Sequence, residues 1–196
     1  MAKPKNTSSS SKQKGMVRII AGKHRGRKLP VLLADGLRPT TDRVKETLFN
    51  WLMHDIIDKN CLDCYAGAGS LGFEAMSRGA SKVTFIEKLP SAAKQLQQNA
   101  AILKAGNCVV FSQDCLVQLA SLNERFDVVF IDPPFRKSLI AKTAALLEEN
   151  QLLSNSAFIY LECEKELATS EVPVNWRLLK EKTAGQVSYR LYQKQE

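Results

Sequence analysis

The sequence predicts a single domain of the α/β class, built on a mostly parallel β-sheet. Three observations lead to this prediction. Short apolar runs alternate with segments long enough to form helices, from about residue 61 to residue 162. The apolar runs are nearly continuous, which is typical of strands covered on both faces. The segments between them have the length of right-handed helical crossovers between parallel strands.

The chain of 196 residues divides into three parts. Residues 1–15 are rich in Ser and Lys and almost free of apolar side chains, so we expect a disordered tail. Residues 16–58 form a basic appendage, and residues 59–196 contain the alternating strands and helices of the main domain. The full chain of 196 residues is long enough to form one hydrophobic core.

The appendage is expected to begin with a basic β-hairpin and to end with a helix. Residues 17–21 and 27–32 read as two short strands around a glycine-containing turn. Pro39 ends this segment, and Thr41 is a suitable N-cap for the following helix. Apolar side chains then recur at helical spacing, at Val44, Leu48, Trp51, Leu52 and Ile56.

The elements of the main domain follow in a regular order. Strands are expected at residues 61–65, 82–87, 108–112, 126–131 and 157–162. Helices are expected between them at residues 70–78, 91–104, 116–122 and 139–149. The alternation of strands and helices ends there. Residues 176–182 and 186–193 flank a turn at Ala184-Gly185 and are predicted to form a hairpin. We therefore expect an antiparallel last strand in an otherwise parallel sheet.

Positive charge is concentrated at the start of the chain. The net charge is +8, with +10 in residues 1–45 (12 Lys and Arg against 2 Asp) and −2 in residues 46–196. A basic arm on a nearly neutral body predicts a polyanionic partner, since neutralising phosphates releases counterions. A solubilising face is the alternative. The candidate phosphate contacts are Arg18, Lys23, Arg25, Arg27, Arg38 and Arg43.

Other sequence features predict a cytoplasmic protein without a metal site. There is no signal sequence and no apolar run of membrane length. The five cysteines are odd in number and scattered, which argues against a disulfide framework. Cys61 and Cys64 form a Cys-x-x-Cys pair on a predicted strand, where this spacing directs the two side chains to opposite faces. Zinc is not expected there.

A glycine-rich loop follows the first strand of the main domain. Gly67, Gly69 and Gly72 match the pattern Gly-x-Gly-x-x-Gly between a strand and its helix. Glu87 lies 20 residues after Gly67, at the end of the next strand, where a carboxylate can bind the ribose hydroxyls of an adenosine. Nicotinamide and flavin enzymes share this pattern, so the glycines alone do not identify the cofactor.

Two further acids favour S-adenosylmethionine. Asp63 directly precedes the loop, where it can approach the amino-acid end and the positive sulfonium, whereas it would repel a pyrophosphate. Asp114 follows the third strand and suits the adenine amino group. All these residues lie at the carboxyl ends of strands, where open α/β sheets bind ligands. The predicted cofactor-binding residues are Asp63, Gly67, Gly69, Gly72, Glu87, Asp114 and Cys115.

The segment Asp132-Pro133-Pro134-Phe135 follows the fourth strand directly. An exocyclic base amine is a poor nucleophile because its lone pair is delocalised into the ring. The Asp132 carboxylate and the Pro133 carbonyl can accept hydrogen bonds from such an amine, and consecutive prolines hold the loop rigid. Phe135 offers a surface on which an extruded base can stack. We therefore predict a nucleic-acid amino-methyltransferase in which these four residues are catalytic and no metal is required.

The chain resembles a known family at these residues. Asp132–Phe135 fits the signature [Asp/Asn/Ser]-Pro-Pro-[Phe/Tyr/Trp] of Rossmann-like class I amino-methyltransferases. Residues 18–22, 25–30, 37–52, 62–67 and 184–192 are similar to the bacterial 16S ribosomal RNA guanine-N2 methyltransferases called the RsmD family, and the similarity extends over about residues 16–194.

The resemblance implies a seven-stranded sheet whose last strand is antiparallel. It also implies methylation of a guanine N2 in 16S rRNA within an assembled or assembling small ribosomal subunit. The basic residues of the N-terminal segment are then expected to contact RNA.

Three alternatives compete with this interpretation. A nicotinamide-dependent oxidoreductase would use the glycine loop and Glu87 but leaves Asp132–Phe135 and the basic arm unexplained. A non-catalytic ribosome-assembly factor could keep the fold without activity, although the intact Asp132 speaks against it. Methylation of adenine N6 or of another base amine would use the same loop geometry.

Overall fold

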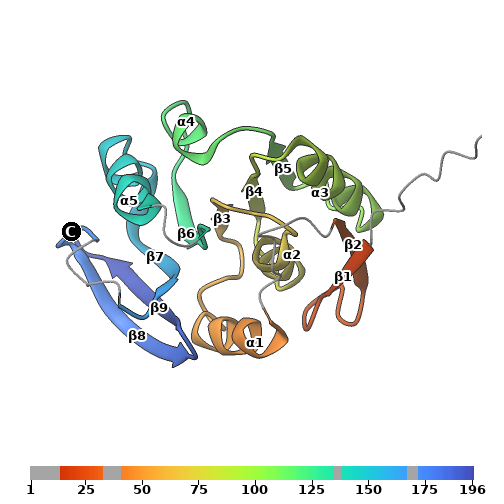
Figure 1. The fold of residues 1–196 in the computed structure, drawn as a ribbon, viewed down its shortest axis with the longest axis horizontal. Coiled ribbons are helices and arrows are strands. Elements are labelled where there is room, and N and C mark those ends of the chain that lie inside the picture. Colours follow the sequence, from red (N-terminus) through yellow and green to blue (C-terminus); the bar gives the residue numbers. More distant parts are fainter. Residues whose placement is uncertain (1–13, 33–40, 135–137, 167–171) are drawn as a thin grey trace, which may run out of the picture.

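The computed structural model describes residues 14–32, 41–134, 138–166 and 172–196. A two-stranded hairpin and a seven-stranded sheet flanked by helices make up the fold (Figure 1). The sheet strands are β3 (Asn60–Asp63), β4 (Lys82–Ile86), β5 (Cys108–Phe111), β6 (Phe126–Ile131), β7 (Leu153–Glu164), β8 (Trp176–Ala184) and β9 (Val187–Lys194). The helices are α1 (Asp42–Trp51), α2 (Ser70–Ser77), α3 (Pro90–Ile102), α4 (Cys115–Leu119) and α5 (Leu139–Glu149). The hairpin consists of β1 (Lys14–Arg18) and β2 (Lys28–Leu32).

The predicted fold class is confirmed by the strand order of the large sheet, β5-β4-β3-β6-β7-β9-β8. Strands β3 to β7 are mutually parallel, and β9 is antiparallel to both of its neighbours. The last strand is inserted between β7 and β8. Most side chains of β9 are buried and most of β8 are exposed, so the more apolar strand of the terminal hairpin lies in the interior of the sheet.

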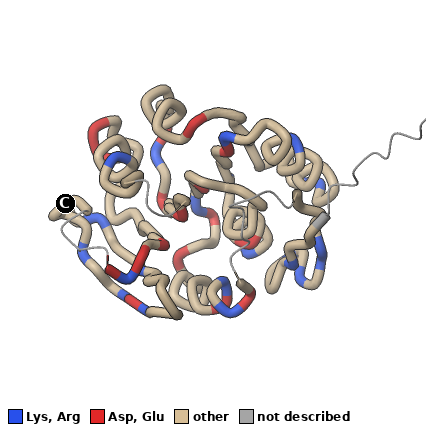
Figure 2. Tube along the Cα trace, in the orientation of Figure 1, with Lys and Arg blue, Asp and Glu red and all other residues tan. Residues whose placement is uncertain are grey.

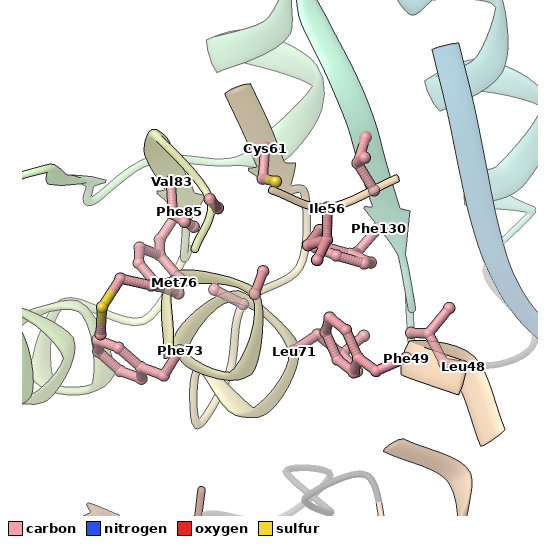
Figure 3. Close-up of a cluster of buried hydrophobic side chains, with 14 of the residues drawn as sticks. Leu48, Phe49, Ile56, Cys61, Leu71, Phe73, Met76, Val83, Phe85 and Phe130 are labelled. Atoms are coloured by element: carbon pink, nitrogen blue, oxygen red, sulfur yellow. The ribbon is translucent and has the colours of Figure 1, made fainter. Parts of the chain in front are cut away.

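Two hydrophobic clusters cover the two faces of the sheet. Side chains of α1, α2 and α3 pack on one face, and those of α4 and α5 pack on the other. Figure 3 shows the first cluster, in which Phe49 of α1 approaches Phe130 of β6 with ring centroids 6.0 Å apart. The appendage therefore shares its core with the main domain.

Strand β3 is the topological switch point of the sheet. The chain proceeds from β3 to β4 and β5 on one side and then returns to β6 on the other side of β3. At such a point the connections after the two central strands leave in opposite directions, which opens a crevice at their carboxyl ends. The segments after β3 and β6 thus meet at one edge of the sheet.

Several boundaries differ from the prediction. Helix α1 has the expected N-cap, since Thr41 Oγ1 accepts from the Val44 amide, but it ends at Trp51 and not near Ile56. Leu52 and Ile56 are nevertheless buried, because the turn after the helix packs on the same core. Strand β1 begins at Lys14, inside the segment expected to be disordered. It ends before Ile20 because the Ile20 and Ala21 amides bond to Glu74 of α2. The remainder of the tail lies outside the described residues.

Candidate functional site

The carboxyl ends of β3 and β6 lie directly beside each other. Asp63 and Phe130 are register partners, and the Cys64 amide donates to the Phe130 carbonyl at 3.0 Å. The segment after β4 is joined to the end of β5 in the same way, because the Glu87 amide donates to the Phe111 carbonyl. The predicted cofactor and chemistry residues that follow β3, β4, β5 and β6 are therefore gathered at one edge of the sheet.

The glycine loop is a tight turn between β3 and α2. Gly67 and Gly69 have φ values of +51° and +74°, a left-handed conformation that other residues adopt only with strain. The Gly69 amide donates to the Ala66 carbonyl at 2.6 Å, which closes the turn. Gly72 has a different role, because a Cβ atom there would lie 2.2 Å from the Phe85 ring. The third glycine thus allows α2 to pack closely on β4.

Asp63 is almost completely buried, with 2% of its surface exposed. Its Oδ2 atom accepts a hydrogen bond from the Gly72 amide at 3.1 Å. Burial raises the pKa of Asp63 to about 7, and the Glu87 charge adds to this effect while the Gly72 amide opposes it. An amide in the first turn of α2, which a pyrophosphate would use, is therefore already paired with a carboxylate.

Glu87 joins the glycine loop to the start of α3. Its two carboxylate oxygens accept from the Gly67 amide at 2.8 Å and from the Leu89 amide at 2.7 Å. The carboxylate is thereby held in one orientation at the end of β4. A pocket between β2 and α3 opens beside this loop and is lined by Gly67, Ala68, Val31 and Leu96, among others.

The two candidates after β5 have different environments. Asp114 is the N-cap of α4 and accepts from the Leu116 amide at 3.0 Å. The ammonium of Lys88, 2.9 Å away, holds the pKa of Asp114 below its usual value. Cys115 is buried in the core cluster beneath α4 and α5. Asp114 is therefore at the surface of the site, whereas the Cys115 side chain is part of the packing below it.

Asp132 follows the last residue of β6 and has no hydrogen-bond donor among the residues that the structure describes. Burial raises its pKa well above the ordinary value, and the charges of Glu162 and Asp63 contribute in the same direction. Pro133 is buried and Pro134 is exposed. Phe135 lies outside the described residues. The loop thus presents a partly buried carboxylate whose ionised form is destabilised.

Glu162 was not identified from the sequence. It lies near the end of β7, with 9% of its surface exposed, and its Oε1 atom accepts from the Tyr160 hydroxyl at 2.9 Å. Burial raises the pKa of Glu162, and the hydrogen bond from Tyr160 opposes this. The sequence does contain a feature that could have identified Glu162, because this acid ends an otherwise apolar predicted strand. The same feature identified Glu87.

The basic hairpin is fixed to the C-terminal half of α2. Glu74 is fully buried and accepts from the Ile20 and Ala21 amides at 2.8 and 3.0 Å. Ser77 Oγ accepts from the His24 amide and donates to the Ala21 carbonyl. Neither Glu74 nor Ser77 could be identified from the sequence as an anchor, since their partners are more than 50 residues away.

This anchoring leaves most predicted phosphate contacts exposed. Figure 2 shows the basic residues of the hairpin on the side of the molecule next to α3. Arg18 is less available because it forms an ion pair with Asp42 at 2.9 Å. Arg38 lies outside the described residues. Arg18 is also exposed, and the exposed candidates without an ion pair to a described residue are Lys23, Arg25, Arg27 and Arg43.

The described part of the chain contains neither a metal-binding cluster nor a membrane-spanning helix. Over these ranges, no group of three or more His, Cys, Asp or Glu side chains is arranged to hold a metal ion. None of the helices in the same ranges has the length and apolar character needed to cross a membrane.

The sequence and the fold match known proteins over nearly the whole chain. The family model described as "Conserved hypothetical protein 95" matches residues 17–193. Ribosomal RNA small subunit methyltransferase D of Escherichia coli K12 is 51% identical over 195 residues, which cover 100% of this chain and 96% of that protein. The protein of the same name from Haemophilus influenzae is 55% identical over 184 residues, covering 92% and 95%.

A solved structure agrees with these matches. The Escherichia coli protein yhhF is 52% identical and superposes with a TM-score of 0.85, covering 92% of this chain and 99% of that chain. The seven-stranded sheet, mostly parallel with antiparallel C-terminal strands, is that of a class I methyltransferase fold. The chain belongs to the family described as Conserved hypothetical protein 95, the RsmD family of methyltransferases.

Proposed function

We propose that this protein transfers a methyl group from S-adenosylmethionine to the exocyclic N2 amine of a guanine in 16S rRNA of the small ribosomal subunit. The observation that carries the proposal is the adjacency of two strand ends. The glycine loop after Asp63 and the Asp132-Pro133-Pro134 segment follow neighbouring strands, joined by the hydrogen bond from the Cys64 amide to the Phe130 carbonyl. The names of the two curated relatives support ribosomal RNA of the small subunit as the substrate.

The residues at the glycine loop fit S-adenosylmethionine better than a dinucleotide. Asp63 is paired with the Gly72 amide, so a pyrophosphate at the start of α2 would meet a carboxylate in place of a free donor. Glu87 would hold the ribose hydroxyls, Asp63 would face the positively charged amino-acid end, and Asp114 would bind the adenine amino group. When bound, the cofactor supplies a methyl group on a positively charged sulfur, which retains the electron pair of the carbon–sulfur bond.

The Asp132 segment would orient the amine. The Asp132 carboxylate and the Pro133 carbonyl accept its N–H groups, which directs the nitrogen lone pair toward the methyl donor. The amine nitrogen gains a carbon substituent and must lose one proton. Asp132 is a suitable acceptor because its pKa is raised by burial and by the neighbouring carboxylates.

The hairpin supplies the complementary charge for RNA. Lys23, Arg25 and Arg27 are exposed on a turn whose backbone is anchored to α2. Anchoring keeps these side chains at a constant position relative to the glycine loop, since α2 begins in that loop. Phosphate contacts of this kind set the position of the RNA without reading its sequence.

Methyl transfer to purified ribosomal subunits tests the proposal. Small subunits from a bacterial strain that lacks this gene are incubated with the protein and labelled S-adenosylmethionine, and the labelled nucleotide is mapped. We expect one guanine to carry the label, on N2. Label on an adenine would replace the proposed base, and no transfer to subunits or to free 16S rRNA would favour a non-catalytic assembly factor.

A further inference from the structure

Glu162 lies beside Asp132 at the carboxyl edge of the sheet. Ile131 of β6 and Leu161 of β7 are register partners in a parallel pair, so the residues that follow them, Asp132 and Glu162, are neighbours across the two strands. Neighbouring strands are about 4.8 Å apart. The two carboxyl groups are close enough for the charge of Glu162 to raise the pKa of Asp132.

The two side chains also lie on the same face of the sheet. Phe130 and Tyr160 precede Asp132 and Glu162 by two residues, and both belong to the core cluster under α1 and α2. Their rings are in contact, with centroids 6.5 Å apart. Since side chains two residues apart in a strand lie on one face, Glu162 continues the face of Tyr160 toward the site.

The hydrogen bonding of this pair is incomplete among the described residues. Glu162 Oε1 accepts from the Tyr160 hydroxyl, and no described residue donates to Oε2. Asp132 also has no donor there. Glu162 is more than nine-tenths buried, so its carboxylate loses much of its hydration. Such a carboxylate is stabilised when N–H groups donate hydrogen bonds to it.

We infer that Glu162 determines the specificity of the site for guanine by accepting the N1–H of the base while Asp132 accepts the neighbouring N2 amine. This inference rests on the proposed function. Guanine presents N1–H and the N2 amine side by side, two donors that match two carboxylates. Adenine presents its amine beside the N1 lone pair, which a carboxylate at Glu162 would repel. A site that hydrogen-bonds a polar group of the base rejects an analogue without it.

Replacing the target guanine with 2,6-diaminopurine tests the role of Glu162. This base keeps the 2-amino group that accepts the methyl, but its N1 is an acceptor. Small subunits are reconstituted with guanine or diaminopurine at the mapped position, and initial rates of methyl transfer are compared. We expect the unmodified protein to prefer guanine by about 100-fold or more. Glu162→Gln should reduce this preference at least about tenfold, because the glutamine amide can donate to N1.

Glu124→Gln is the matched control. Glu124 is paired with Lys82, which begins β4 at the amino edge of the sheet, so the same chemical change there should leave the preference unaltered. Binding of S-adenosylhomocysteine and thermal melting check that Glu162→Gln retains the cofactor site and the fold. Should this variant not fold, Tyr160→Phe removes the hydroxyl that orients Glu162 and should reduce the preference at least about threefold.

The outcomes separate the inference from the proposed function. One outcome is that the unmodified protein methylates guanine and a folded Glu162→Gln protein has the same guanine-to-diaminopurine rate ratio. This outcome would overturn the role of Glu162. The same unchanged ratio in Tyr160→Phe would overturn it if Glu162→Gln does not fold. Absence of transfer to guanine by the unmodified protein would instead refute the proposed function.

Discussion

The carboxylate of Asp63, at the end of β3, accepts a hydrogen bond from the backbone amide of Gly72, in the first turn of α2, at 3.1 Å. This contact spans the glycine loop and joins the strand to the helix that follows it. It is made by a side chain that is 2% exposed and whose pKa is raised from 3.8 to about 7. The loop is therefore held by an acid whose ionisation destabilises the folded protein.

Asp63→Asn should stabilise the protein in a pH-dependent way. The folded state holds the Asp63 proton more tightly than the unfolded state, so the stability of the unmodified protein falls as pH rises from about 4 to about 7. Asparagine does not titrate and still accepts from Gly72. The stabilisation should be small near pH 4 and reach at most about 4 kcal/mol at pH 8. Denaturant unfolding at both pH values measures it, and an equal difference at the two would show that Asp63 does not titrate in this range.

Asp132→Ala should remove activity without removing the cofactor. Asp132 follows β6 and takes no part in the hydrogen bonds that Asp63 and Glu87 make at the glycine loop, so we expect kcat to fall by about 100-fold or more and cofactor affinity to stay within several-fold. Single-turnover methyl transfer and calorimetric titration with S-adenosylhomocysteine measure the two quantities. A large loss of cofactor affinity would assign Asp132 to binding instead of catalysis.

The acid limb of the pH profile should report the carboxylate cluster. In the proposed mechanism Asp132 accepts a proton and must be ionised. Its pKa is raised by burial, Glu162 and Asp63, so kcat/KM should decline as pH falls through that raised value. Glu162→Gln removes one neighbouring negative charge and should move the limb to lower pH. The two proteins are compared over pH 5 to 9, and a limb at the same pH in both would mean that Asp132 and Glu162 are not coupled.

Charge reversal at Arg25 and Arg27 should weaken binding to the ribosomal subunit and flatten its salt dependence. Each lost phosphate contact reduces the slope of log K against log salt by about one. Filter binding at several salt concentrations measures the slope. Reversal at Lys180 and Lys182, exposed on β8, is the control and should change the slope less. Equal effects of the two pairs would place the RNA elsewhere on the surface.

Glu74→Gln should loosen the hairpin while sparing the cofactor loop. The fully buried carboxylate accepts from the Ile20 and Ala21 amides and from Arg78, so its neutralisation leaves Arg78 without its partner. We expect a loss of about 2–4 kcal/mol in unfolding free energy. Hydrogen exchange at the Ile20 and Ala21 amides should accelerate, whereas unaltered exchange there would contradict the anchoring role.

The position of most candidate site residues could be predicted from the sequence, because they follow recognisable strands. The glycines, Glu87, Asp114 and Asp132 each follow an apolar strand, and parallel strands bring such residues to one edge. The separate roles of the glycines were not predictable. Gly67 and Gly69 serve the backbone conformation of the turn, whereas Gly72 makes room for the Phe85 ring, and that distinction depends on the packing of α2 against β4.

The sequence by itself determined the kinds of elements, their order, the N-cap of α1 and the motifs that follow β3 and β6, because periodicity, turn chemistry and capping act within a few residues of the chain. The tertiary structure decided that β9 lies between β7 and β8, that Glu74 anchors the hairpin and that Glu162 lies beside Asp132. The contacts of Glu74 and Glu162 join residues 30 or more positions apart, and the place of β9 depends on which strand of the terminal hairpin is buried. Such contacts are determined by strand order and strand register. Neither strand order nor register is encoded in a local pattern of the sequence.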